Sequence, residues 1–326
     1  MRKENILNIT DREFNVIREF VTERNVVELT MFICENFNEW SKTVPQELVQ
    51  QIIDFHKRFQ FWGNLEPEKN NIELIEKRAY FLKNRWDDIE EFYDALSDHR
   101  SKAILVMILE NWLSFYYGRI PKVKEQYFRP YFDMDLLKVS KDEVFVDLGA
   151  WMGDTIEDYI QTYGHKSFKK IYTYEILESN IDILQKKFSM EPKILIRPVG
   201  VCDKKGEMYL SQNDTTDACS LTDEGKIKIE TVTLDEDIKE KISFIKMDIE
   251  GAEKKALVGA KKHLEEDCPK LAISIYHSNE DLIEIFRLIR RLQPNYRFYL
   301  RYYGHLHLPT DYILICVPMK REISKN

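Results

Sequence analysis

The chain has 326 residues, of which 44% are hydrophobic and 32% are charged, as expected of a folded protein with one large or two moderate domains. Its formal charge of −8 disfavours binding to DNA or RNA, because such proteins need a basic surface to displace counterions from phosphates. The longest apolar run, 103–109, is far shorter than the roughly 20 residues needed to cross a bilayer.

The cysteines are odd in number, widely scattered and never in CxxC spacing, which argues against a zinc site and against a disulfide framework. The first residues have no apolar core of the kind found in signal peptides. We therefore expect a protein of the reducing cytoplasm. The cysteines are Cys34, Cys202, Cys219, Cys268 and Cys316.

Residues 1–118 predict an all-α N-terminal domain. Apolar residues such as Phe14, Ile17 and Val21 recur at helical spacing, and no stretch alternates with a period of two. The last helix of this domain is expected over 101–117, with Gly118 as its stop signal.

A linker is expected over 119–140, where two prolines accompany a group of aromatic residues. These aromatic side chains could stack on a sugar ring, or pack between two domains. The same segment holds Asp133-Met134-Asp135, which fits a metal-binding DxD, although such a pattern arises easily in a chain so rich in acids. The aromatic residues are Tyr127, Phe128, Tyr131 and Phe132.

Residues 141–319 alternate short apolar runs with helical stretches, which predicts βαβ units and a doubly wound parallel sheet of the α/β class. The last two runs, 297–303 and 312–318, have only a loop between them, so we expect a terminal antiparallel hairpin. The preceding strands are expected at 144–146, 171–174, 194–196, 244–247 and 271–276, and the helices at 154–163, 179–188, 252–264 and 280–292.

Polar or flexible residues follow the ends of these strands, where open α/β sheets bind their ligands. Asp147 ends the first strand, and Gly149 then permits a tight turn and a close approach of the backbone to a ligand. Glu175 ends the second strand, where an acid can accept both ribose hydroxyls of a bound nucleoside. The alternative is that Glu175 is a solvated helix cap.

The segment 246–253, Lys-Met-Asp-Ile-Glu-Gly-Ala-Glu, is the most specific in the chain. Asp248 and Glu250 leave the fourth strand, and Gly251 permits a sharp entry into the next helix. With Glu253, three carboxylates within six residues concentrate negative charge near the expected ligand.

Taken together, these motifs resemble those of the FkbM family of methyltransferases. The resemblance extends over roughly residues 140–318. It implies the class I, Rossmann-like methyltransferase fold, S-adenosylmethionine as cofactor, and methyl transfer to a hydroxyl of a sugar or of a polyketide-like product. It rests on 147–155, Glu175, 248–253 and Tyr276-His277, with Leu234-Asp235 and 300–303 in support.

The chain departs from the family pattern at three places, which bear on the acceptor more than on the cofactor. Trp151 stands where a smaller polar residue is frequent, and Cys219 stands where a serine is common. Residues 301–303 are Arg-Tyr-Tyr in place of the frequent Arg-His-Tyr.

The motifs after the first, second and fourth strands are expected to line the S-adenosylmethionine site. Because they all follow residue 140, the helical domain is expected to shape the acceptor pocket or a homodimer interface. The acceptor itself would be a small molecule or a glycan. The expected cofactor residues are Asp147, Gly149, Ala150, Gly153, Thr155, Glu175 and Asp248.

A sugar hydroxyl is a weak acid, so a positioned general base should assist its attack on the methyl group. His277 follows the fifth strand and titrates in the useful range. Asp248 or Glu250 could orient it, or the three could hold a magnesium or manganese ion that acidifies the hydroxyl. Alternatively, His277 merely ends its strand; His305 and His307 are second-rank candidates.

Two other functions remain open. The fold could have lost activity and only bind a ligand, although the intact Asp147, Glu175 and Asp248 weigh against this. The chain could also be a metal-dependent glycosyltransferase that uses the DxD at 133–135, although that motif precedes the predicted sheet. Motifs of nucleic-acid methyltransferases, such as Asn/Asp-Pro-Pro-Tyr, are missing.

Overall fold

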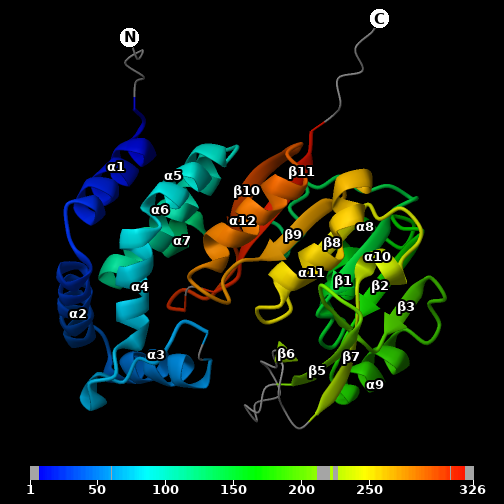
Figure 1. Cartoon of the computed structure of the whole chain (residues 1–326), viewed down its shortest axis with the longest axis horizontal. Coiled ribbons are helices and arrows are strands. Elements are labelled where there is room, and N and C mark those ends of the chain that lie inside the picture. Colours follow the sequence, from blue (N-terminus) through cyan, green and yellow to red (C-terminus); the bar gives the residue numbers. More distant parts are fainter. Residues whose placement is uncertain (1–6, 60, 211–220, 223–226, 309, 320–326) are drawn as a thin grey trace, which may run out of the picture. The chain divides into compact units, whose positions relative to one another are not determined.

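The computed structural model describes residues 7–59, 61–210, 221–222, 227–308 and 310–319. The chain divides into two compact units (Figure 1). The first comprises Met1–Glu125, Tyr276–Ile283 and Tyr299–Tyr312, and the second comprises the intervening and remaining residues. The helical half of the chain thus forms one unit with two short segments of the later half. None of the described helices is long and apolar enough to cross a membrane.

The N-terminal part of the first unit is helical, as the sequence predicts. The longest apolar run of the chain lies in α6, where residues 104–109 are all buried, as expected of a helix surrounded by others. The helices are α1 (Ile9–Thr22), α2 (Val26–Thr43), α3 (Gln46–Arg58), α4 (Glu73–Asn84), α5 (Trp86–Ala95), α6 (His99–Ser114) and α7 (Ile120–Val123).

The ends of these helices are set by local hydrogen bonds and backbone conformation. Asn25 and Glu28 form a reciprocal capping box at the start of α2, and Asp98 accepts a hydrogen bond from the backbone N–H of Ser101 at the start of α6. The prediction that Gly118 ends the last helix is wrong, because Phe115 takes the left-handed conformation (φ 52°) and stops α6 at Ser114.

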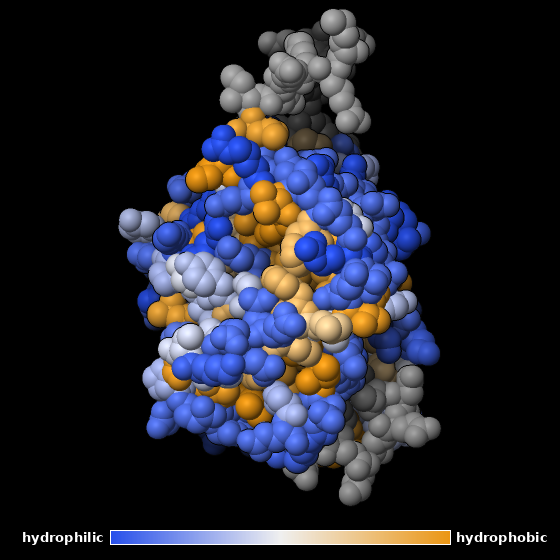
Figure 2. All heavy atoms as spheres, turned by 90° about the vertical axis from the view of Figure 1, so that its left-hand side faces the viewer, coloured by the Kyte–Doolittle hydropathy of each residue, from blue (hydrophilic) through white to orange (hydrophobic). Residues whose placement is uncertain are grey.

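Figure 2 looks onto the side of the first unit that carries α1 and α2, where apolar side chains lie in small groups among polar ones. Val16, Val27 and Met31 are among the exposed apolar residues of these two helices. Such scattered exposure is ordinary for a protein surface.

The second unit is built on a mostly parallel sheet with the strand order β10-β11-β9-β8-β1-β2-β3. β1 pairs in parallel with both β2 and β8, while β11 runs antiparallel to β9. The predicted doubly wound sheet and its antiparallel end are therefore confirmed. The strands are β1 (Val144–Leu148), β2 (Lys170–Tyr174), β3 (Ile194–Arg197), β8 (Phe244–Met247), β9 (Lys270–Ser274), β10 (Tyr296–Tyr302) and β11 (Tyr312–Pro318).

The strand order reverses at β1, because the chain continues to β2 on one side and β8 lies on the other. In open α/β sheets, ligands bind at the carboxyl ends of the strands beside such a reversal. The helices that connect the strands are α8 (Asp154–Tyr163), α9 (Glu178–Lys187), α10 (Leu234–Asp237), α11 (Glu253–Gly259) and α12 (Asp281–Leu292).

Two features of this unit differ from the sequence prediction. The helix expected over 252–264 is divided into α11 and a π-helical turn at His263–Asp267. A second, smaller sheet has the order β4-β7-β5-β6. Its strands are β4 (Gly200–Val201), β5 (Gly206–Leu210), β6 (Leu221–Thr222) and β7 (Lys228–Val232).

The last turn of α11 touches the backbone next to β4, which generates a test of the packing. A Cβ atom on Gly259 would lie 2.0 Å from the carbonyl oxygen of Cys202, whereas a Cβ atom on Gly206 would meet no atom within 4 Å. We expect Gly259→Ala to lower the free energy of unfolding by about 1–3 kcal/mol, because backbone must move.

Gly206→Ala is the control and should change the unfolding free energy by less than about 0.5 kcal/mol. Urea unfolding followed by circular dichroism measures both variants. Equal stability of the two variants would contradict the close approach of α11 to Cys202.

Candidate active site

A buried ion pair joins the carboxyl ends of β1 and β8. Asp147 and Lys246 are partners across the parallel ladder, and Lys246 Nζ lies 3.1 Å from Asp147 Oδ1. The ammonium group also donates to the carbonyl oxygens of Gly149, at 2.7 Å, and Leu148, at 3.3 Å. Lys246 therefore fixes the backbone that enters the glycine loop.

Burial opposes the charged forms of Asp147 and Lys246, whereas their attraction to each other favours the charged forms. Burial raises the pKa of Asp147 to about 6, against the opposing pull of the Lys246 charge. Burial alone would lower the pKa of Lys246, but the charges of Asp147 and Asp248 outweigh it and raise that pKa. Near neutral pH, both groups are therefore charged.

The loop after β1 requires glycine at its first turn. Gly149 has φ 79°, and a Cβ atom there would lie 1.9 Å from the carbonyl oxygen of Asp248. The backbone N–H groups of Gly149 and Ala150 both donate to the carbonyl oxygen of Tyr174, at 3.1 Å. Further on, a Cβ atom at Gly153 would lie 2.6 Å from the ring of Phe188, so this glycine brings α8 close to α9.

A cavity of about 310 Å³ lies in the second unit, at the carboxyl ends of β1, β2 and β8. Its size falls within the range of sites for small molecules. Of the predicted residues, Gly149, Thr155, Glu175, Asp248 and Glu250 line it, whereas Asp147, Ala150 and Gly153 are not among its lining residues. Asp147 is fully buried, and its contacts support the loop from beneath.

Glu175 lies in this cavity with a fixed orientation. Its Oε1 accepts hydrogen bonds from the backbone N–H groups of Ile176, at 2.8 Å, and Leu177, at 2.9 Å. Only 7% of the residue is exposed, so it is not a solvated surface acid. This orientation leaves the second carboxylate oxygen, Oε2, as the group that a ribose hydroxyl would contact.

Tyr131, one of the aromatic residues for which the sequence leaves open a contact with a sugar or packing between domains, lies at the cavity. The Tyr131 hydroxyl donates a hydrogen bond of 2.7 Å to Asp248 Oδ2, its ring centre lies 5.2 Å from Lys246 Nζ, and the side chain lines the cavity. Lys246 also lines the cavity. In the sequence, its charge inside an otherwise apolar strand is the feature that could have marked it as a site residue. Tyr131 carried no signal beyond the aromatic cluster around it.

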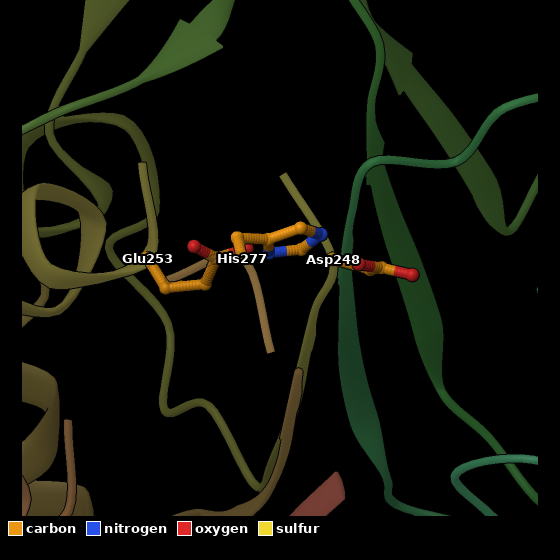
Figure 3. Close-up of side chains that lie close together, drawn as sticks. All are labelled: Asp248, Glu253 and His277. Atoms are coloured by element: carbon orange, nitrogen blue, oxygen red, sulfur yellow. The ribbon is translucent and has the colours of Figure 1, made fainter. Parts of the chain in front are cut away.

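Figure 3 shows the carboxylates of Asp248 and Glu253 and the imidazole of His277. Asp248 and Glu253 come from the end of β8 and the start of α11 in the second unit, and His277 comes from the segment after β9 that belongs to the first unit. The predicted roles of Asp248, Glu250 and His277 stay predictions. Glu250 has φ 55° and lines the cavity, while Glu253 Oε1 accepts a hydrogen bond from Ile249 N at 2.9 Å.

The predicted histidines lie beside other rings, and the DxD segment forms a local turn. The His277 ring packs against Tyr276 and Phe61, with ring centres 4.2 and 5.2 Å apart. His305 is exposed, and its ring centre lies 5.7 Å from that of His307. In the DxD segment, Asp133 Oδ1 accepts hydrogen bonds from the backbone N–H groups of the next residues in a local turn.

Residues 195–300 match the family model described as the methyltransferase FkbM domain. This part of the chain is therefore similar to the methyltransferase FkbM domain. The match includes Asp248, Glu250 and His277, whereas the glycine loop and Glu175 precede it. Cys219, one of the three departures from the family pattern, lies outside the described residues.

The similarity to solved structures concerns the fold. The chain resembles the crystal structure of methyltransferase FkbM from Methylobacillus flagellatus KT, with a TM-score of 0.65 and 24% identity over 83% of this chain and 70% of that one. Fainter similarity connects it to an rRNA methylase from Streptococcus thermophilus (TM-score 0.39, 14% identity, 60% of this chain, 100% of that one). It also resembles Aeropyrum pernix fibrillarin with bound S-adenosylmethionine (TM-score 0.36, 10% identity, 60% of this chain, 72% of that one).

No match was found among functionally curated proteins. The family model bears out the predicted resemblance to FkbM methyltransferases, and the M. flagellatus structure confirms the predicted class I methyltransferase fold. The roles of individual site residues stay predictions.

The ion pair beneath the loop gives a stability prediction. Lys246→Met should lower the free energy of unfolding by about 3–5 kcal/mol, because it leaves the buried Asp147 carboxylate uncompensated. The double variant Asp147→Asn/Lys246→Met should recover part of that loss, since it carries no buried charge at this position. Denaturant unfolding of both variants measures the difference, and a double variant less stable than the single one would contradict the account.

Glu175 gives a binding prediction. Glu175→Ala should weaken S-adenosylmethionine binding by roughly 1–3 kcal/mol, the usual cost of losing a charged hydrogen-bond acceptor. Glu178→Ala is the matched control, because Glu178 is exposed and lies outside the cavity. Isothermal titration calorimetry measures both affinities; equal affinities in the two variants would remove Glu175 from the cofactor site.

Proposed function

We propose that this methyltransferase transfers the methyl group of S-adenosylmethionine to a hydroxyl of a sugar or glycan precursor. The observation that carries the proposal is the cavity at the strand reversal, with Glu175 on one side and Asp248 on the other. Glu175 would hold the ribose hydroxyls of the cofactor. Asp248 follows β8, next to the strand that leads to His277.

The charges that line the cavity suit a cationic cofactor. Asp154, Glu175, Asp248 and Glu250 line it together with one cation, Lys246, which is itself paired with Asp147. An acidic cavity attracts the positive sulfonium of S-adenosylmethionine and repels the diphosphate of a nucleotide sugar donor. This supports the methyltransferase over the alternative glycosyltransferase.

The transfer is a displacement at the methyl carbon. The acceptor oxygen forms a bond to the methyl group while the bond from carbon to sulfur breaks, so that S-adenosylhomocysteine leaves and the hydroxyl proton passes to a base. Because β8 and β9 are parallel neighbours, with Met247 opposite Ile273, residues just beyond their carboxyl ends are expected near each other. We assign the base to His277, which is 3% exposed.

Asp248, with Glu250 or Glu253, would orient His277, or these groups would hold a magnesium or manganese ion that acidifies the hydroxyl. The proposal places the enzyme in the reducing cytoplasm. Among the described residues, Cys34, Cys202, Cys268 and Cys316 form no disulfide bond, which is consistent with that compartment.

Incubation with labelled S-adenosylmethionine and a panel of sugars, nucleotide sugars and glycans tests the activity. A thermal shift with S-adenosylmethionine but not with UDP would support the cofactor assignment. Stabilisation by UDP alone would contradict it.

His277→Ala should retain its affinity for S-adenosylmethionine while kcat falls at least about a hundredfold, because the base is lost. His305→Ala is the control, since His305 is an exposed loop residue, and its kcat should stay near that of the wild type. Transfer of labelled methyl groups measures both. A chelator separates the two roles: if a metal ion takes part, activity falls and returns with magnesium or manganese. Near-normal turnover in His277→Ala would eliminate it as the base.

A further inference from the structure

The first unit contains a buried arginine without an acidic partner among the described residues. Arg78 lies on α4, is 2% exposed, and forms no hydrogen bond or ion pair with any described residue. Its Nε atom is fully buried. Two tyrosines, Tyr117 and Tyr312, are the titratable groups that act on its charge.

The charge of Arg78 persists at neutral pH, and no acid among the described residues pairs with it. Burial lowers the pKa of Arg78, but only to about 10. Burial and the charge of Arg78 lower the pKa of His56 to about 3, so His56 is neutral, and burial raises the pKa of Tyr312, so its phenol is neutral as well. A buried charge without a counter-charge is costly, and proteins keep one where it has a use.

Aromatic rings lie beside the guanidinium. Its central carbon lies 5.7 Å from the ring centres of both Trp112 and Phe115, an arrangement that stabilises a cation without neutralising it. In the same unit, His56 Nδ1 and Asn111 Oδ1 are buried without a hydrogen-bond partner among the described residues. These groups can bond to the hydroxyls and oxygens of a polar ligand.

A chain of ring contacts connects this cluster to His277 within the first unit. The ring centre of Tyr276 lies 4.2 Å from that of His277 and 5.8 Å from that of Tyr312, a residue near enough to Arg78 for the two groups to influence each other's pKa. Phe61 contacts His277 on another side. The cation and the proposed base therefore belong to one continuous cluster.

We propose that Arg78 binds an anionic group of the methyl acceptor, a carboxylate or a phosphate, while the hydroxyl to be methylated lies at His277. This inference rests on the proposed function, because it assigns the ligand of Arg78 as the acceptor. A planar guanidinium matches either anion with two parallel hydrogen bonds, and the low exposure strengthens them. A neutral sugar would leave the cation uncompensated, so the site selects acidic acceptors.

Calorimetric titration of the full chain with glucuronic acid, glucose 1-phosphate and glucose, without methyl donor, tests the proposal. The wild type should bind at least one of the two acidic sugars about tenfold or more tightly than glucose, and the sugar that binds shows which anion is recognised. In Arg78→Met this preference should disappear, while the affinity for S-adenosylmethionine stays unchanged. In Arg78→Lys, which keeps the charge without the planar pair of donors, an intermediate preference is expected.

Arg12→Met is the control, because it removes an exposed cation from the same unit and should leave the preference intact. Arg78→Met should melt no lower than the wild type, because an apolar side chain replaces an uncompensated charge. A lower melting temperature with an unchanged anion preference would show a purely structural role and overturn the proposal. So would a wild type that binds neither acid more tightly than glucose. Neither result depends on turnover, so failure here is distinct from failure of methyl transfer.

Discussion

Lys246 places an ammonium group inside a sheet that is buried on both faces, and its contacts lie at the carboxyl ends of β1 and β8. It pairs with Asp147 and binds the carbonyl oxygens that lead into the glycine loop. A lysine at this depth is tolerated because its charge is matched and its donors are used. The position of the loop, and with it one wall of the cavity, follows from this one interaction.

The loop in turn sets how closely the two strand ends approach. Gly149 comes so near to the carbonyl oxygen of Asp248 that no side chain fits between them. Asp248 is thereby held at the cavity wall, where Tyr131 donates a hydrogen bond to its carboxylate. The backbone of β1, the carboxylate after β8 and a tyrosine from the segment before the sheet therefore form one connected structure.

The sequence predicts those features that depend on neighbouring residues. Helix 154–163 was predicted with the bounds it has in the structure, and the acids at the strand ends follow from the topology of a parallel sheet. The sequence does not predict the hydrogen bond from Tyr131 to Asp248, because it joins positions far apart in the chain. β4 and β6 have two residues each, too few to show a period. Glu250 takes the left-handed backbone conformation, which changes the direction of the chain between Glu250 and Glu253. The spacing of the acids in the sequence does not reveal this turn.

Lys246 and Arg78 are both buried cations, yet their surroundings differ in one respect. Lys246 has Asp147 beside it, so its charge is balanced within the protein and it serves the architecture of the loop. Among the described residues, Arg78 has neutral rings and phenols beside it and no acidic partner, so the proposed acceptor would supply the balancing charge. The cavity of the second unit carries the opposite sign, with four acids on its lining. A cationic cofactor and an anionic acceptor would each be attracted to one site and repelled by the other, because exchanging them would bring together like charges. Charge would then direct the cofactor and the acceptor to different sites, in addition to any contribution from shape complementarity.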